Sequence, residues 1–251
     1  MKNLGKTIRA EIEDYKVLLR NVPSVTMVFF VISVVLMNLF ANKEMLNIEW
    51  LALDCGFLLS WLSFLCMDML TKRFGPKAAI KLSFFAVGVN LVSSAIFYII
   101  SLIPGNWGEF YTFNSSIANQ ALDNTIGGTW YVLLGSMTAF AAASIVNALL
   151  NAGVGRLLKN KNSFLTYALR SYVSTAIGQF VDNLIFALIV SHVFFGWSML
   201  QCITCSIAGA IAELLSEVIF SPLGFAVCKK WDKINVGKDY IDYARKAAAG
   251  V

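Results

Sequence analysis

Long stretches without a charged residue constrain the fold of this chain more than any other feature. Four such runs of 22, 27, 32 and 30 residues lie between Arg20 and Lys43, Lys81 and Glu109, Asp123 and Arg156, and Asp182 and Glu213. A transmembrane helix needs roughly 20 consecutive, mostly apolar residues, so each run is long enough to cross a bilayer. Only 14% of the residues are charged, against about 25% in a soluble domain. This composition excludes a soluble globular enzyme, a disordered protein and a disulfide scaffold.

The apolar runs predict an all-α, polytopic membrane protein with six transmembrane helices. The expected spans are Val22–Ala41, Leu51–Leu70, Leu82–Ile103, Thr129–Leu150, Ala168–Phe195 and Met199–Cys228. They are too many and too internal to be a cleaved signal peptide. The chain then divides into an N-terminal segment 1–21, a transmembrane domain 22–228 and a basic tail 229–251.

The cations predict the orientation of these spans, because Lys and Arg collect in cytoplasmic loops. Nineteen of the 20 lie in the N-terminal segment, after the second span, between the fourth and fifth spans, and in the C-terminal tail. Lys43 alone falls on the opposite side. Both termini are therefore expected in the cytoplasm, and the basic balance gives no reason to invoke nucleic acid.

Two segments outside the spans have their own patterns. Leu4, Ile8, Ile12, Tyr15 and Leu19 recur about one helical turn apart. This spacing predicts a short amphipathic helix, either on the inner membrane surface or in solvent. Residues Pro104–Gly128 are rich in Pro, Gly, Asn and Ser and are expected to form the long outer loop.

Matching polar positions suggest that the six spans form a 3+3 inverted repeat, as in many transporters. The first span ends in Asn38-x-x-x-Asn42 and the fourth ends in Asn147-x-x-x-Asn151. Ser60 and Asp68 in the second span are separated by seven residues, as are Ser174 and Asp182 in the fifth.

Five acids fall inside the apolar spans, namely Asp54, Asp68, Asp182, Glu213 and Glu217. A carboxylate at the membrane centre costs about 2.5–3.5 kcal/mol on insertion scales, so it normally faces a cavity or a partner. Asp54 is near a span end and can reach the interface. Asp68 either pairs with the basic residues one turn away or has a functional role.

The last two spans each carry polar and small residues on one face. On the fifth span these are Ser171, Thr175, Gly178, Gln179, Asp182 and Asn183, and on the sixth they are Cys205, Gly209, Glu213 and Glu217. Neutral side chains would hold helices together at lower cost than carboxylates do. We therefore expect Asp182, Glu213 and Glu217 to line a polar cavity that suits a ligand with paired N–H donors, a cation or a proton. Glu213 and Glu217 would repel each other if both were ionised, so one is expected to hold a proton.

No catalytic or cofactor motif is found in the sequence. His192 is the single histidine, and one imidazole cannot supply a multi-His metal site. Cys202 and Cys205 form a CxxC inside an apolar span, which is weak evidence for metal or redox chemistry. There is no Walker A loop, dinucleotide fingerprint or H-E-x-x-H, so no cofactor is expected and ATP energy would have to come from another protein.

Three segments carry a family resemblance. They are Asn38-Leu-Phe-Ala-Asn42-Lys43 with Asp68-Met-Leu-Thr-Lys-Arg-Phe-Gly75-Pro-Lys-Ala, the stretch Arg170-Ser-Tyr-Val-Ser174-Thr-Ala-Ile-Gly178-Gln179-Phe-Val-Asp182-Asn-Leu-Ile-Phe186, and Glu213-Leu-Leu-Ser-Glu217 followed by Ser221-Pro222. Together they resemble the vitamin uptake transporter family, and within it the queuosine precursor transporters. The chain departs from the family pattern at Lys72 and Ala212.

The resemblance implies a six-helix importer of 7-cyano- or 7-aminomethyl-7-deazaguanine or queuine in the inner membrane of a prokaryote. A deazaguanine offers an N–H and NH2 edge, which a carboxylate such as Glu213 or Asp182 can accept in a two-pronged hydrogen bond. The candidate substrate-binding residues are Asn38, Asp68, Ser174, Gln179, Asp182, Asn183, Phe186, Glu213 and Glu217. Lys43 and Arg170 are candidates for a gate or ion pair.

Three functional hypotheses follow. The first is a secondary active importer that is coupled to protons. The second is a substrate-binding membrane subunit of an ATPase-driven importer, for which Ala139-x-x-x-Ala143 offers a small-residue docking face. The third is an intramembrane enzyme, which the missing nucleophile–base pair disfavours. The sequence leaves open which deazapurine is carried and whether the unit is a monomer or a homodimer.

Overall fold

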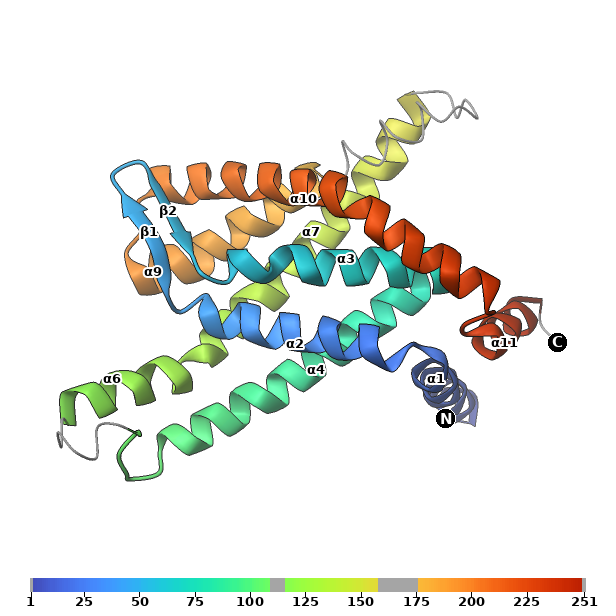
Figure 1. The fold of residues 1–251 in the computed structure, drawn as a ribbon, viewed down its shortest axis with the longest axis horizontal. Helices are drawn as coiled ribbons and strands as arrows, with labels where there is room; N and C mark the ends of the chain where they lie inside the picture. The colour runs from blue at the N-terminus through green and yellow to red at the C-terminus, as the bar shows by residue number, and fades with distance from the viewer. Residues whose placement is uncertain (1, 109–115, 158–175, 250–251) are drawn as a thin grey trace.

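The helices of the chain lie side by side in a bundle, seen in a computed structural model that describes residues 2–108, 116–157 and 176–249 (Figure 1). The helices are α1 Lys2–Asn21, α2 Ser24–Phe40, α3 Phe57–Phe74, α4 Pro76–Ser101, α6 Ser116–Gly127, α7 Thr129–Leu157, α9 His192–Phe195, α10 Met199–Lys233 and α11 Lys238–Ala249. A helical stretch over 176–186 leads into the π-helix η1 Ala187–Ser191. The two strands are β1 Glu44–Ile48 and β2 Leu51–Asp54.

The long helices of the bundle expose much apolar surface. Among the described residues, four helical segments are long and apolar enough to cross a membrane, namely Pro76–Ser101, Ser116–Ala143, Ala176–Phe195 and Met199–Phe220. A fifth is α2 when it is taken together with the preceding helix. Only 22% to 33% of each apolar window is buried inside the protein. Soluble monomers rarely expose large contiguous apolar surfaces, so lipid must cover these helices in a multi-pass membrane protein.

A short antiparallel hairpin interrupts the otherwise helical fold. β1 pairs with β2, with Ile48 opposite Leu51 and Asn47 opposite Ala52. The described fold is mostly helical, as expected, but this hairpin departs from an all-helical chain, and the predicted span Leu51–Leu70 therefore starts too early. A short apolar run does not by itself distinguish strand from helix, and tertiary pairing decides the outcome.

The helix that follows the hairpin begins at Phe57 because Asp54 satisfies its first N–H groups. Asp54 Oδ1 accepts hydrogen bonds from the backbone N–H of Gly56 at 2.8 Å and of Phe57 at 3.3 Å. A carboxylate in this position stabilises a helix start, since the first turn leaves unpaired N–H groups.

The expected loop Pro104–Gly128 contains a helix instead, α6, which runs beside α4 (Figure 1). Side chains of α6 bind the preceding segment: Asn119 Oδ1 accepts from Trp107 N at 2.5 Å, and Asp123 Oδ1 accepts from Trp107 Nε1 at 2.9 Å. The polar composition of this segment suggested a loop. Composition alone does not show that its polar groups are paired with each other, and this pairing supports the helix.

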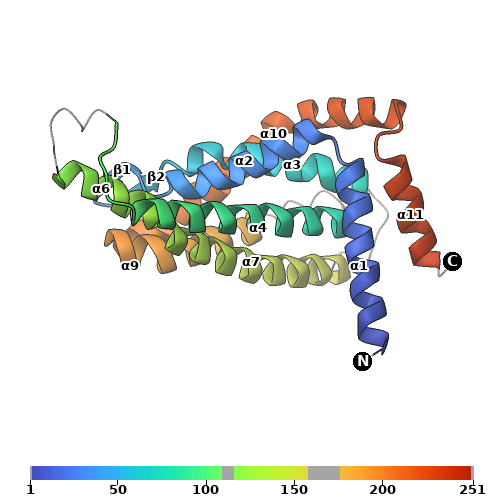
Figure 2. The ribbon, with the colours of Figure 1, turned by 90° about the horizontal axis from the view of Figure 1, so that it is seen from below.

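Both chain ends lie at the same end of the bundle, which we call the termini end, and the hairpin lies at the other, the hairpin end (Figure 1). Helix α1 is bent by 107° from α2, and Figure 2 shows α1 and α11 nearly at right angles to the bundle. Leu18 of α1 is fully buried, and Tyr15 OH donates to Lys81 O at 2.9 Å. Residues Lys2–Asn21 thus form the predicted helix, and Ile12 remains exposed.

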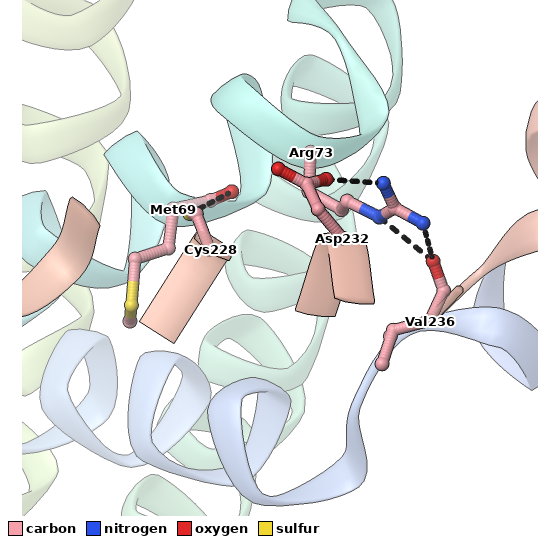
Figure 3. Close-up of polar contacts among 5 residues, drawn as sticks. All are labelled: Met69, Arg73, Cys228, Asp232 and Val236. Carbon is pink, nitrogen blue, oxygen red and sulfur yellow. Dashed lines mark hydrogen bonds and ion pairs between the residues drawn. The ribbon is translucent and has the colours of Figure 1, made fainter. Parts of the chain in front are cut away.

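Side-chain contacts tie α3 to the last turns of α10 and to the segment after it, at the termini end (Figure 3). Arg73 donates from Nε and Nη2 to Val236 O at 2.8 and 2.6 Å, and from Nη1 to Asp232 Oδ1 at 2.5 Å. Beside it, Cys228 Sγ donates to Met69 O at 3.6 Å. Arg73 thus holds the turn that leads into α11.

Candidate functional site

A cavity of about 100 Å³ lies within the bundle toward the hairpin end. Its polar lining comes from elements far apart in the sequence: Asn38 of α2, Asp54 and Ser60 around the start of α3, Asp182 and Asn183 of the helix over 176–186, and Glu213 of α10. Helix periodicity turns the helical side chains of this set toward the same space, and strand β2 brings Asp54 to it. We call this space the first cavity.

Three groups define the chemistry of the first cavity. Glu213 is only 7% exposed, and its Oε2 accepts a hydrogen bond from Asn183 Nδ2 at 3.4 Å. Asp182 Oδ1 is buried and has no hydrogen-bond partner. A buried carboxylate oxygen without a partner is costly. The first cavity therefore presents an acceptor that is ready for a donor from a ligand.

A glycine lets two of these helices approach closely. A Cβ built on Gly209 of α10 would lie 2.6 Å from Asn183 Nδ2. Small residues at such contacts allow close approach of membrane helices. Gly209 thereby keeps the amide of Asn183 within reach of Glu213.

The hairpin covers the first cavity at the hairpin end. Leu53 and Asp54 line the cavity directly, and Ala52 packs fully buried in a cluster with Trp197 and Cys202. Trp197 Nε1 donates to Glu44, and Gln201 Nε2 donates to Ile48 O at 2.7 Å. These contacts fix the hairpin over the ends of α9 and α10.

The π-helix η1 lies on the wall of the first cavity. Its Ala187 and Ser191 both line the space, and Ser191 Oγ is buried without a partner. Single turns of π-helix occur often at functional sites. The wider turn lies directly after Phe186, which lines the same cavity.

A second cavity of about 130 Å³ adjoins the first. The two share Met37, Asn38, Phe64, Ser136 and Asp182 in their linings. The second cavity also reaches α4, through Ser83 and Asn90. Asp182 therefore borders both spaces.

The structure brings five of the predicted substrate-binding residues together on the first cavity: Asn38, Asp182, Asn183, Phe186 and Glu213. Gln179 is half-buried and lines neither cavity. Asp68 lies on an exposed side of α3 and lines neither cavity either. Asp68 and Asp182 hold matching positions in the predicted inverted repeat, but only Asp182 lines a cavity.

Of the two predicted gate residues, only Lys43 lies in the described part of the chain, and it lines neither cavity. Lys43 is exposed in the turn between α2 and β1. Arg170 and Ser174 lie outside the described residues, and so does the side chain of Glu217.

Sequence reasoning missed several lining residues. Asp54 was expected at the membrane interface, but the hairpin brings it to the cavity. Asn90 lies at helical spacings from Ser83 and Ser94, and Ser136 lies two residues before Thr138, so each helix carried a polar signal that the sequence reasoning did not use. Their role depends on which side of the helix faces the bundle, and the sequence does not show this.

The small-residue face that was expected to dock an ATPase module is not available on the surface. Ala139 is fully buried and Ala143 is 9% exposed. Both alanines pack within the bundle, so the second hypothesis loses its supporting feature.

Comparison with known proteins identifies the family. The family model described as "Putative vitamin uptake transporter" matches residues 54–227, which run from the end of β2 through most of α10 and include most of the cavity lining. No curated protein and no solved structure gives a significant match. The match covers well over half of the chain and points to a transporter rather than an enzyme. The chain belongs to the vitamin uptake transporter family.

Proposed function

We propose that the protein is a secondary active, proton-coupled importer of queuosine precursors, with the first cavity as its substrate site. The substrates would be 7-cyano-7-deazaguanine, 7-aminomethyl-7-deazaguanine or queuine. The observation that carries the proposal is the buried, unpartnered Asp182 Oδ1 on a cavity that Glu213 and Asn183 also line.

The recognition chemistry follows from the hydrogen-bonding groups of the ligand. A 7-deazaguanine presents a ring N–H beside an amino group, and a carboxylate accepts this pair in a two-pronged hydrogen bond. Asp182 is assigned this role because its Oδ1 lacks a donor, whereas Glu213 already accepts from Asn183. Phe186 lines the same cavity and is assigned to stack on the heterocycle.

The transport path is assigned from the position of the cavity. We assign the six spans to α2, α3, α4, α7, the helical stretch over 176–195 and α10, with the termini end in the cytoplasm because the cations favour that side. The hairpin then covers the cavity from the outside, and import requires it to move. A 3+3 inverted repeat remains part of this proposal, since Asn147 and Asn151 lie outside the described side chains.

Proton coupling is proposed because Asp182 and Glu213 line one small cavity. Two carboxylates in such a space repel each other unless a proton neutralises one of them. Binding a ligand with N–H donors changes that balance, so proton uptake and substrate binding are linked. Symport of a proton with the substrate would provide the driving force.

Uptake of labelled precursor by cells that make defined variants tests the proposal. We expect Asp182→Asn and Glu213→Gln to reduce uptake at least about tenfold, since each removes a charge-assisted hydrogen bond. The matched control is Glu49→Gln, which changes an exposed carboxylate in the hairpin turn in the same way. Undiminished uptake by both cavity variants would remove these residues from the site.

Two further measurements separate the energy sources. Uptake that is insensitive to a protonophore would contradict proton coupling. Uptake by the purified protein alone in vesicles would exclude an ATPase-driven importer, and a strict requirement for a co-purifying ATPase would support that alternative.

A further inference from the structure

We propose that the second cavity is a second substrate station, in which Asn90 binds a planar ligand through a ring N–H and its adjacent carbonyl. This inference rests on the proposed function, since it concerns the same substrate path. A 7-deazaguanine carries such a lactam edge, as do other heteroaromatic lactams. Asn90 would then act as a specificity-determining residue beyond the carboxylates of the first cavity.

The primary observation is an asparagine whose side chain has no partner. Asn90 is 1% exposed, and both its Nδ2 and its Oδ1 are buried without a hydrogen bond. Buried polar side chains nearly always have a partner, and an unpaired one carries a substantial desolvation cost. An asparagine with both atoms free presents a donor next to an acceptor, which is the complement of a lactam edge.

Two serine hydroxyl groups on the wall of the second cavity already have partners. Ser63 Oγ donates to Ser60 O at 2.8 Å, and Ser83 Oγ donates to Ala79 O at 3.1 Å. Both hydroxyl groups therefore donate to backbone carbonyl groups of their own helices. Asn90 differs from these two serines because it offers an unused donor together with an unused acceptor.

The remaining walls suit a flat ring. Phe30, Phe64 and Phe140 come from α2, α3 and α7 and line the second cavity together. Aromatic side chains bind planar heterocycles through stacked or edge contacts. A few polar residues among apolar walls are typical of a small-molecule site, where they fix the orientation of the ligand.

The second cavity lies on the termini side of the first. On α2 the first cavity uses Met37 to Ala41, whereas the second reaches back to Phe30; on α3 the second extends forward to Met67. Both changes lead away from the hairpin. Asp182 lines both cavities. A ligand that moves from the first cavity to the second therefore stays next to this carboxylate. The two cavities thus form successive positions along one path.

The chain supplies a matched control on the same helix. Ser94 lies one turn beyond Asn90, is 2% exposed, and has an unpartnered Oγ. It lines neither cavity. A general effect of removing a buried polar group from α4 would appear in Ser94→Ala as well, whereas an effect on binding would appear only at Asn90.

The test measures ligand affinity and thermal stability of the purified full-length protein. The probes are 7-cyano-7-deazaguanine, its O6-methylated analogue, which lacks the lactam edge, and a pterin, a flavin and xanthine as other lactams. We expect Asn90→Leu to weaken binding of the lactam by about tenfold or more. The unliganded protein should keep or gain thermal stability, because an apolar side chain of similar volume replaces an unsatisfied amide. Ser94→Ala should stay within about twofold of the wild type.

The outcomes separate this inference from the proposed function. Binding of 7-cyano-7-deazaguanine that Asn90→Leu leaves within about twofold overturns the inference alone. If the deazaguanine does not bind but another lactam does, and Asn90→Leu weakens it, the substrate of the proposed function is wrong and the inference stands. A wild-type protein that binds none of the lactams, or binds the O6-methylated analogue equally well, overturns the inference. If Asn90→Leu does not fold, Asn90→Ala repeats the same comparison.

Discussion

The contact between Gly209 and Asn183 gives the most demanding test of the site geometry. A Cβ on Gly209 would lie 2.6 Å from Asn183 Nδ2, and the two next nearest atoms, at 3.1 and 3.6 Å, belong to the same amide. Gly209→Ala therefore presses on a single side chain. The amide nitrogen must move at least 0.4 Å to reach 3.0 Å, the closest approach that real Cβ atoms show.

The expected magnitude follows from two opposing effects. Overpacking of a tight contact costs about 1–3 kcal/mol, whereas alanine favours a helix over glycine by about 0.8–1.0 kcal/mol. Gly209→Ala should therefore lower the free energy of unfolding by up to about 2 kcal/mol. In an Asn183→Ala background the clashing amide is gone, and the same change should be neutral or stabilising. The coupling between the two positions is then about 1–3 kcal/mol.

Unfolding of the purified protein and of three variants in detergent measures this coupling. The variants are Gly209→Ala, Asn183→Ala and the double variant. Gly224→Ala on the same helix is the control, because its Cβ would meet only side-chain atoms, Leu65 Cδ1 at 3.1 Å and Met69 Cγ at 3.4 Å, and should show no coupling to Asn183. An equal cost of Gly209→Ala with and without the Asn183 amide would refute the proposed contact.

Two further predictions concern the ends of the bundle. Gly237 has φ +70°, and a Cβ there would lie 2.2 Å from Phe74 Cε1, so Gly237→Ala should detach the C-terminal helix and accelerate its proteolysis by trypsin; unchanged cleavage would contradict this. Trp197→Phe keeps the aromatic packing but removes the hydrogen bond to Glu44. It should loosen the hairpin and speed thiol labelling of Cys202, which is fully buried, whereas labelling at the wild-type rate would show that the hydrogen bond does not hold the hairpin.

Much of the site was predictable because membrane helices make polar residues conspicuous. Asp182, Asn183 and Glu213 share faces that periodicity alone reveals, and the structure places all three on one cavity. A carboxylate in an apolar run is expensive enough to indicate a cavity or partner. The same argument does not decide between the two interpretations of Asp68, which is equally conspicuous in the sequence but lies exposed on α3 and lines neither cavity. The free-energy cost of a carboxylate in an apolar helix marks the residue as unusual, but it does not show which side of the helix the residue lies on.

The sequence by itself determined that this is a membrane protein with apolar helices and a few carboxylates inside them. Whether a segment lies in lipid or in water follows from the composition of that segment alone. Only the tertiary structure decided that residues 44–54 pair as a hairpin over the cavity, and that Asp54 and Asn90 turn inward. Strand pairing and the rotation of a helix about its axis depend on contacts between segments far apart in the chain. On α4 the polar residues Ser83, Asn90 and Ser94 recur at spacings of seven and four, which favours one face of the helix. Only packing against the other helices decides that this face lines the second cavity at Asn90 and not at Ser94.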